Sequence, residues 1–166
     1  MSTKILLDLG GGNEPHIEDG YETVSTDRHD FSKDFVGKNC RFVKHDLLTK
    51  IPFASNSVDK IWCHHVLEHL PHQLPNGDDA LIFVMKEIAR VLKPGCEAHI
   101  IVPWMKHPNA TRHPAHYRFF DHEVFNWFGA DYPSPDLEAY GMPRVLTVTQ
   151  NKVVEETHVY AIFTKL

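Results

Sequence analysis

The sequence lacks any long apolar run. No stretch of its 166 residues approaches the ~20 consecutive apolar residues that span a membrane, and the N-terminal region has no apolar segment typical of a signal peptide. Cysteine is scarce, because only Cys40, Cys63 and Cys96 occur and they form no C-x-x-C pair. These absences predict a cytoplasmic protein with reduced thiols and no membrane partner.

An excess of positive charge is also missing. Lys and Arg total 17 against 22 Asp and Glu, which gives a net charge of −5. No global field therefore favours nucleic acid, and we expect nucleic acid not to be the partner. Because the sequence has no internal repeat, low-complexity tract or linker, residues 1–166 are predicted to form a single domain. Histidine, in contrast, occurs 13 times, which leaves a metal site open without locating one.

Short apolar runs alternate with loops and one amphipathic helix. The helix is predicted over residues 79–92, where apolar residues recur at helical spacing before Lys93-Pro94-Gly95 stops it. Glu87 and Arg90 on this helix are expected to form an exposed ion pair worth little. This alternation predicts an α/β domain with a mostly parallel sheet. The predicted strands are residues 5–10, 21–27, 41–46, 57–66, 96–103, 144–150 and 156–165, and the last two are expected to pair antiparallel.

The connection between the first two predicted strands is GGGNEPHIEDG, which is rich in glycine and has little apolar periodicity. A full crossover helix is not expected there, so the first connection is predicted to be a loop.

Polar residues stand at the carboxyl ends of the predicted strands, which is where open α/β sheets bind ligands. The first strand delivers Asp8 and the glycines 10–12, the second ends in Asp27, the third in Asp46-Leu47 and the fourth in His64-His65. Carboxylates at three strand ends suit a ligand with hydroxyls, amino groups and positive charge. Each feature taken singly has a simpler explanation. The glycines could be there merely to form a tight turn, and Asp27 or Asp46 merely to cap a strand.

Four segments, in order, resemble the class I S-adenosylmethionine-dependent methyltransferases, and in particular their compact type-11-like branch. They are DLGGGNEP, VSTD, HDLLTKIPFASNSVDKIWCHHVLEHL and MKEIARVLKPG. The resemblance implies a Rossmann-like sheet of seven strands, mostly parallel with an antiparallel last strand, and a first crossover helix that is reduced or absent. It also implies S-adenosylmethionine as the cofactor.

The same resemblance assigns roles by position. Asp8, Gly10, Gly11 and Gly12 would shape the methionine end of the cofactor pocket. Asp27 would bind the ribose hydroxyls, Asp46 the adenine amino group with Leu47 alongside, and His64 would line the site. Glu14 departs from the family pattern, because many members have a glycine there.

His65, Glu68 and His69 spell H-x-x-E-H, a zinc signature of some proteases. Zinc binding would require both histidines on one helical face, but a strand runs into this segment and Pro71 ends any helix after about one turn. The resembling family carries HVLEHL here without zinc. We therefore expect no metal, and a zinc hydrolase is only a distant third interpretation.

Residues 98–120 contain no acid but include Lys106, Arg112, Arg118 and four histidines. RHPAHYRFF resembles a D-P-T-H-x-R-F-F segment that related methyltransferases carry after the fifth strand. The resemblance implies that this region binds the acceptor, and the acid-free stretch favours an anionic one. The predicted acceptor-binding residues are Arg112, His113, Tyr117 and Arg118, and the candidate catalytic bases are His65 and His116.

The resulting hypothesis is a methyltransferase acting on a small-molecule or carrier-bound acceptor. The alternative is a cofactor-binding, non-catalytic partner subunit of a methyltransferase complex, because no acceptor domain is evident and a partner or homo-oligomer could complete the site. No N-P-P-Y-type motif follows the fourth strand, which argues against methylation of DNA or glutamine amides.

Overall fold

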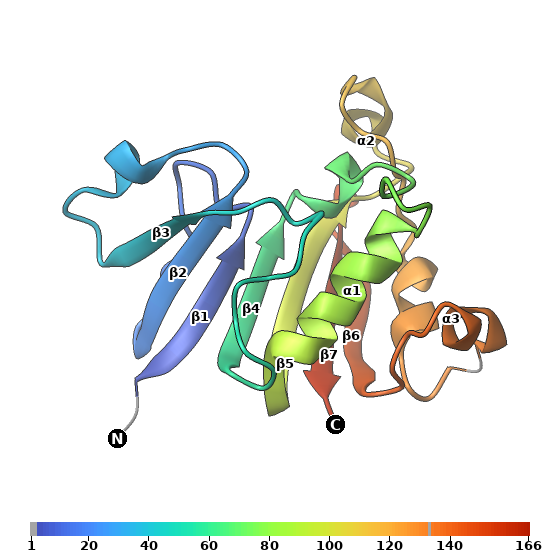
Figure 1. Ribbon diagram of the computed structural model, residues 1–166. Coiled ribbons are helices and arrows are strands. Elements are labelled where there is room, and N and C mark those ends of the chain that lie inside the picture. The colour runs from blue at the N-terminus through green and yellow to red at the C-terminus, as the bar shows by residue number, and fades with distance from the viewer. Residues whose placement is uncertain (1–2, 133) are drawn as a thin grey trace.

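Seven strands form one sheet in the order β3-β2-β1-β4-β5-β7-β6 in the computed structural model, which describes residues 3–132 and 134–166 (Figure 1). The pairs β1–β2, β1–β4, β2–β3 and β4–β5 are parallel, whereas β7 is antiparallel to both β5 and β6. The predicted sheet with its antiparallel last strand is confirmed. The strands are β1 (Lys4–Leu9), β2 (Tyr21–Asp27), β3 (Cys40–Lys44), β4 (Val58–His64), β5 (Leu92–Pro103), β6 (Leu146–Val154) and β7 (His158–Lys165).

The predicted amphipathic helix is α1 (Ala80–Val91), which lies across one face of the sheet (Figure 1). Asp79 begins it by accepting hydrogen bonds from the backbone N–H groups of Leu81 and Ile82 at 2.8 and 3.0 Å. Strand β5 begins at Leu92, so Lys93-Pro94-Gly95 lies inside the strand and the predicted start at residue 96 was late. The reason is tertiary, because Leu92 pairs with Val58 ahead of a register shift.

The remaining helices are short. They are α2 (Pro108–Arg112), α3 (Pro135–Ala139) and the 3-10 helices η1 (Ser32–Phe35), η2 (Leu67–His69) and η3 (His122–Phe128). No helix lies between β1 and β2 in the described part of the chain, which confirms that the first crossover helix is absent.

The core lies between the sheet and α1, where apolar strand residues such as Leu7, Ile61 and Ile100 are fully buried. On the opposite face, the loop after β1 takes the place of a crossover helix. His16 in that loop stacks on Trp62 of β4, with ring centroids 3.9 Å apart, and Glu18 accepts a hydrogen bond from Lys60 at 2.6 Å. The loop is therefore held down at its far end, while its start remains at the carboxyl edge of the sheet.

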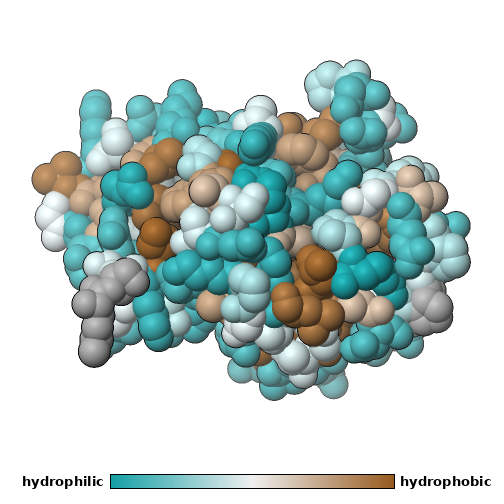
Figure 2. All heavy atoms as spheres, turned by 60° about the horizontal axis from the view of Figure 1, so that its bottom comes forward, coloured by the Kyte–Doolittle hydropathy of each residue, from teal (hydrophilic) through white to brown (hydrophobic). Residues whose placement is uncertain are grey.

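The surface carries no continuous apolar band in the view of Figure 2, which turns forward the end of the sheet opposite the strand carboxyl ends and shows separate hydrophobic patches on a mainly hydrophilic face. The most exposed large apolar side chains, Val36, Leu166 and Tyr140, belong to different segments of the chain. Among the helices of the described residues, none has the length and apolar character needed to cross a membrane.

Candidate active site

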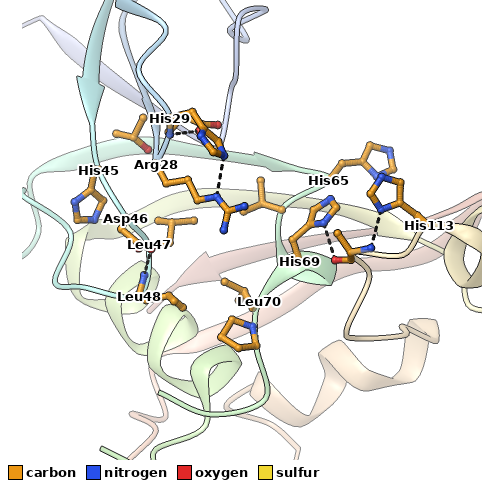
Figure 3. Close-up of a pocket in the computed structure, with 16 residues that line it drawn as sticks. Arg28, His29, His45, Asp46, Leu47, Leu48, His65, His69, Leu70 and His113 are labelled. Atoms are coloured by element: carbon orange, nitrogen blue, oxygen red, sulfur yellow. Dashed lines mark hydrogen bonds between the residues drawn. The ribbon is translucent and has the colours of Figure 1, made fainter. Parts of the chain in front are cut away.

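A pocket of about 410 Å³ opens at the carboxyl edge of the sheet. Figure 3 shows His65, His69 and His113 at one end of this first pocket and Asp46 at the other. The first pocket is lined by Gly10, Thr26, Asp27, Arg28, His29, His45, Asp46, Leu47, Leu48, His65, Val66, His69, Leu70, Pro71, His113 and Ala115.

Two carboxylates lie in this pocket because β2 and β3 are parallel and end at the same edge. Asp27, the last residue of β2, accepts the N–H of His29 through Oδ1 at 2.8 Å. Asp46, two residues after β3, accepts the N–H of Leu48 through Oδ1 at 3.0 Å. Each of these bonds uses only one oxygen and orients the side chain, so the other oxygen can receive a ligand donor. Leu47 supplies an apolar wall beside them.

Only the first of the three predicted glycines lines the pocket. Gly10 has φ +71°, and a Cβ there would lie 2.4 Å from Cγ2 of Val66, so packing as well as backbone conformation requires glycine. A Cβ on Gly11 would lie 2.0 Å from Oδ2 of Asp8. Gly11 and Asp8 therefore support the loop from below, and neither they nor Gly12 line either pocket.

A second pocket, of about 480 Å³, adjoins the first, and His65 and His113 line both. Of the residues predicted to bind the acceptor or act as base, Arg112 and His116 also line it. No acidic side chain does. The full lining is His65, Pro103, His107, Asn109, Arg112, His113, Pro114, His116, Thr157 and His158.

Arg118, which was predicted to bind the acceptor, lines neither pocket. Its guanidinium donates to the backbone carbonyls of Pro71 and His72 at 2.8 and 2.9 Å and forms an ion pair with Asp79 at 3.2 Å. The side chain is 11% exposed and thus fixes the segment after η2. Tyr117 also lines neither pocket; its backbone N–H donates to the carbonyl of Glu68 at 2.8 Å, and its side chain is exposed.

His65 stands at the junction of the two pockets in an unusual backbone conformation, with φ +57°. Its N–H donates to the carbonyl of Ile101 at 2.9 Å, which holds the turn after β4. Its Nδ1 lies 2.9 Å from Oε1 of Glu68, a side chain that is 1% exposed. When Oε1 accepts this bond, Nδ1 carries the proton and Nε2 presents a lone pair. Glu68 was not predicted as a site residue.

The H-x-x-E-H segment does not gather its two histidines. Helix η2 spans three residues, and the chain becomes extended at Leu70 before Pro71. His65 lies beside His64 and His158, with ring centroids 4.2 and 4.9 Å away, whereas His69 lies beside His113 and His116. The motif thus contributes one histidine, His65 or His69, to each of two separate groups of three histidines.

His64 was expected to line the cofactor site, but it lines neither pocket. Partial burial, together with the neighbouring His65 and His158, lowers the pKa of its imidazole to about 4. His64 is therefore neutral at physiological pH.

Several lining residues escaped sequence analysis. Arg28, His29 and His45 lie within two positions of Asp27 or Asp46 in the sequence, and this proximity was the available signal. Thr157 and His158 line the second pocket from the start of β7, and nothing in their local sequence indicates this. Their position follows from the antiparallel pairing of Pro103 with His158.

Comparison with known proteins agrees with this architecture. The chain matches the methyltransferase domain family over residues 6–100. No curated protein matches it in sequence. Among solved structures, it resembles a chain of the complex between the Haloferax volcanii Trm112 methyltransferase activator and its candidate methyltransferase, at 15% identity and a TM-score of 0.67, covering 98% of this chain and 83% of that one.

Two further solved structures share the fold. A SAM-dependent methyltransferase from Aquifex aeolicus is 19% identical with a TM-score of 0.62, over 97% of this chain and 84% of that one. The 1,6-didemethyltoxoflavin-N1-methyltransferase of Burkholderia thailandensis, solved with its substrate and S-adenosylhomocysteine, is 18% identical with a TM-score of 0.66, over 97% and 70%. The family match spans more than half of the chain, from within β1 to within β5, so the chain belongs to the methyltransferase domain family.

Proposed function

We propose that the chain transfers a methyl group from S-adenosylmethionine to a small or carrier-bound acceptor with an anionic group. The observation that carries this proposal is the pair of adjoining pockets. The first pocket contains the carboxylates of Asp27 and Asp46. The second contains Arg112 and no acid, and the two pockets meet at His65.

The residues of the first pocket fit S-adenosylmethionine. Asp27 has a carboxylate oxygen available for ribose hydroxyls, and Asp46 has one available for the adenine amino group. Leu47 offers an apolar surface to the adenine ring, and the absence of a side chain at Gly10 leaves the backbone open to the ligand. In the structure of the Burkholderia thailandensis methyltransferase, one of the two bound ligands is S-adenosylhomocysteine, the demethylated cofactor.

The bound cofactor supplies an electrophilic methyl group with a good leaving group. The protein therefore needs mainly to align the acceptor and exclude misaligned encounters. A hydroxyl or amine acceptor gains from a base, and Nε2 of His65 can accept its proton. Glu68 acts as a positioning residue, because its buried carboxylate holds Nδ1 of His65 at 2.9 Å.

The second pocket favours an acceptor with a carboxylate or phosphate. Arg112 can bind such an oxyanion through two N–H groups, and His113 and His116 add polar contacts around it. Because no carboxylate lines this pocket, an anionic acceptor meets no like charge from its walls.

A second candidate is a partner subunit that binds the cofactor without turning over alone. The similarity to a chain from the complex with the Trm112 methyltransferase activator supports it, since that complex joins a methyltransferase-type chain to another protein.

The test is methyl transfer by the purified chain from methyl-labelled S-adenosylmethionine to paired acceptors that differ only in bearing a carboxylate or phosphate. We expect turnover on the anionic members, with a KM raised by Arg112→Ala and little change in cofactor affinity. Turnover on neutral acceptors only, unaffected by Arg112→Ala, would refute the anionic acceptor. Cofactor binding without turnover on the anionic panel favours the partner-subunit function.

A further inference from the structure

His69, His113 and His116 converge from two segments of the chain. His69 lies in η2, and the other two follow α2 as an H-x-x-H pair. Their ring centroids are 4.6 to 5.4 Å apart, and one ligand nitrogen from each lies within 4.8 Å of the others. No acid or arginine belongs to the group, so its arrangement is not explained by an ion pair.

Hydrogen bonds fix the protons on two of these rings. Nδ1 of His69 lies 2.9 Å from the carbonyl oxygen of Ala115, and Nδ1 of His116 lies 2.9 Å from that of Ala110. A carbonyl only accepts, so both Nδ1 atoms are donors and both neutral rings present a lone pair at Nε2. This is the tautomer that metal-binding histidines adopt when a backbone carbonyl orients them.

The spacing of the rings suits a shared metal ion. Zinc lies about 2.0–2.1 Å from a histidine nitrogen, so three rings around a tetrahedral zinc have centroids roughly 5 Å apart. The nitrogens must move closer together than they now are. His113 can provide this movement, because it is exposed and its ring only accepts the Ala115 N–H at Nδ1, over 3.2 Å; giving up this bond frees its lone pair for the metal.

The group formed by His64, His65 and His158 is less suited. Its ring centroids are unevenly spaced, at 4.2, 4.9 and 6.4 Å. His64 and His65 are consecutive in sequence, and His65 is held at φ +57°. Both constraints limit how far these two rings can adjust toward one metal ion.

We propose that His69, His113 and His116 bind one divalent transition metal of the zinc class, with the fourth coordination position open to the second pocket. This replaces the sequence-based expectation that no metal binds. A site with three histidines and one open position is a known arrangement for zinc. His116 lines the second pocket and His113 lines both, so water or an acceptor oxygen can reach the open position. In this role His116 is a ligand and not a base.

The metal would also fasten the segment after α2 to η2. Three hydrogen bonds already join them near the site: Nδ1 of His69 donates to the Ala115 carbonyl, and the backbone N–H groups of Tyr117 and Arg118 donate to the Glu68 carbonyl. The bound ion would add direct bonds across the same junction and fix the wall that separates the two pockets.

The test is a titration of the full chain, produced without a histidine tag, with zinc chloride in competition with a chromophoric chelator. We expect one zinc per chain. Since losing even a second-shell partner typically costs roughly 10- to 100-fold in metal affinity, His113→Ala and His116→Ala should each lower affinity by at least about 100-fold, while His158→Ala stays within about threefold. Cobalt should give the strong visible bands of a tetrahedral site in the wild type, and these should vanish in His113→Ala.

His113 is exposed, so its variant is expected to fold, which circular dichroism checks. Zinc bound no more tightly by the wild type than by His113→Ala would overturn the proposal. Loss of zinc in His158→Ala, with His113→Ala unaffected, would place the metal at the other histidines and overturn it too. The titration uses neither cofactor nor acceptor, so its outcome is independent of the proposed methyl transfer.

Discussion

At the scale of single residues, burial changes the chemistry of Asp8. Its side chain is 2% exposed, and Oδ2 accepts hydrogen bonds from Ser25 Oγ at 2.9 Å and the His16 N–H at 3.1 Å. Burial raises the pKa of Asp8 from 3.8 to about 6, although these two hydrogen bonds oppose the rise. The family resemblance implies that Asp8 shapes the methionine end of the cofactor pocket; its side chain lines neither pocket and supports the glycine loop.

Asp8→Asn should remove a pH-dependent loss of stability. Between pH 3.8 and about 6 the folded chain holds this proton more tightly than the unfolded chain, so the free energy of unfolding falls as pH rises. The shift corresponds to roughly 3 kcal/mol, reached once the pH exceeds the folded pKa. The amide oxygen of Asn can still accept from Ser25 and His16. Urea unfolding from pH 4 to 7.5 should therefore show the variant gaining on the wild type as pH rises. A constant difference across this range would contradict the account.

At the scale of elements, polar networks join the connecting segments to the helices. Glu87 in α1 is 8% exposed; its carboxylate accepts the Ile51 N–H at 2.8 Å and pairs with Arg90 at 2.6 Å. Arg90 also donates to the carbonyls of Phe53 and Ile51. The expectation of an exposed pair was wrong, because the segment before β4 folds over this part of α1 and excludes water.

Glu87→Gln should therefore cost about 2 kcal/mol of unfolding free energy at pH 7, since it leaves the guanidinium without its charged partner. Burial raises the pKa of Glu87, but the hydrogen bonds from Arg90 and Ile51 outweigh this and leave it below the ordinary 4.5. The stabilisation is thus present above pH 4.5 and lost as the pH falls through the lower, folded value. Glu138→Gln is the control, because its pair with Arg144 is 3.6 Å long and Glu138 is 57% exposed. Equal losses in both variants would contradict the proposed difference in burial.

Arg118 provides the second test at this scale. Lysine keeps the charge but cannot reach the carbonyls of Pro71 and His72 and the carboxylate of Asp79 together. Arg118→Lys should lower the unfolding free energy by about 1–2 kcal/mol, whereas Arg112→Lys should change it by less than about 0.5 kcal/mol. Chemical denaturation measures both. A stable Arg118→Lys variant with impaired acceptor binding would restore the sequence-based interpretation.

At the scale of the whole molecule, the sequence predicts most of the fold and about half of the site. Apolar runs and one segment with helical spacing of its apolar residues suffice to predict the sheet, α1 and the absence of the first crossover helix. These patterns depend on local periodicity, which the sequence shows directly. Asp27 and Asp46 line the first pocket because parallel strands end at one edge, and their roles toward the cofactor stay predictions. Local periodicity and strand order do not determine the direction in which a side chain points. Arg118 and His64 therefore lie outside both pockets although the sequence placed them at the site, and His158 was missed because only long-range pairing brings it there.

The cytoplasmic location stays a prediction from the sequence. The resemblance to S-adenosylmethionine-dependent methyltransferases is confirmed at the level of family and fold by the domain match and the structural neighbours. The proposed activity depends on whether the first pocket takes the cofactor.

Calorimetric titration with S-adenosylhomocysteine tests this most directly, using the wild type, Asp27→Ala and the control Asp34→Ala, whose exposed carboxylate lies outside both pockets. We predict one site per chain in the wild type and unchanged affinity in Asp34→Ala. Asp27→Ala should remove the proposed charge-assisted ribose contacts, worth roughly 1.5–3 kcal/mol, which corresponds to about 10- to 100-fold weaker binding. Absence of binding by the folded wild type, or equal affinity in Asp27→Ala and the wild type, would contradict the account.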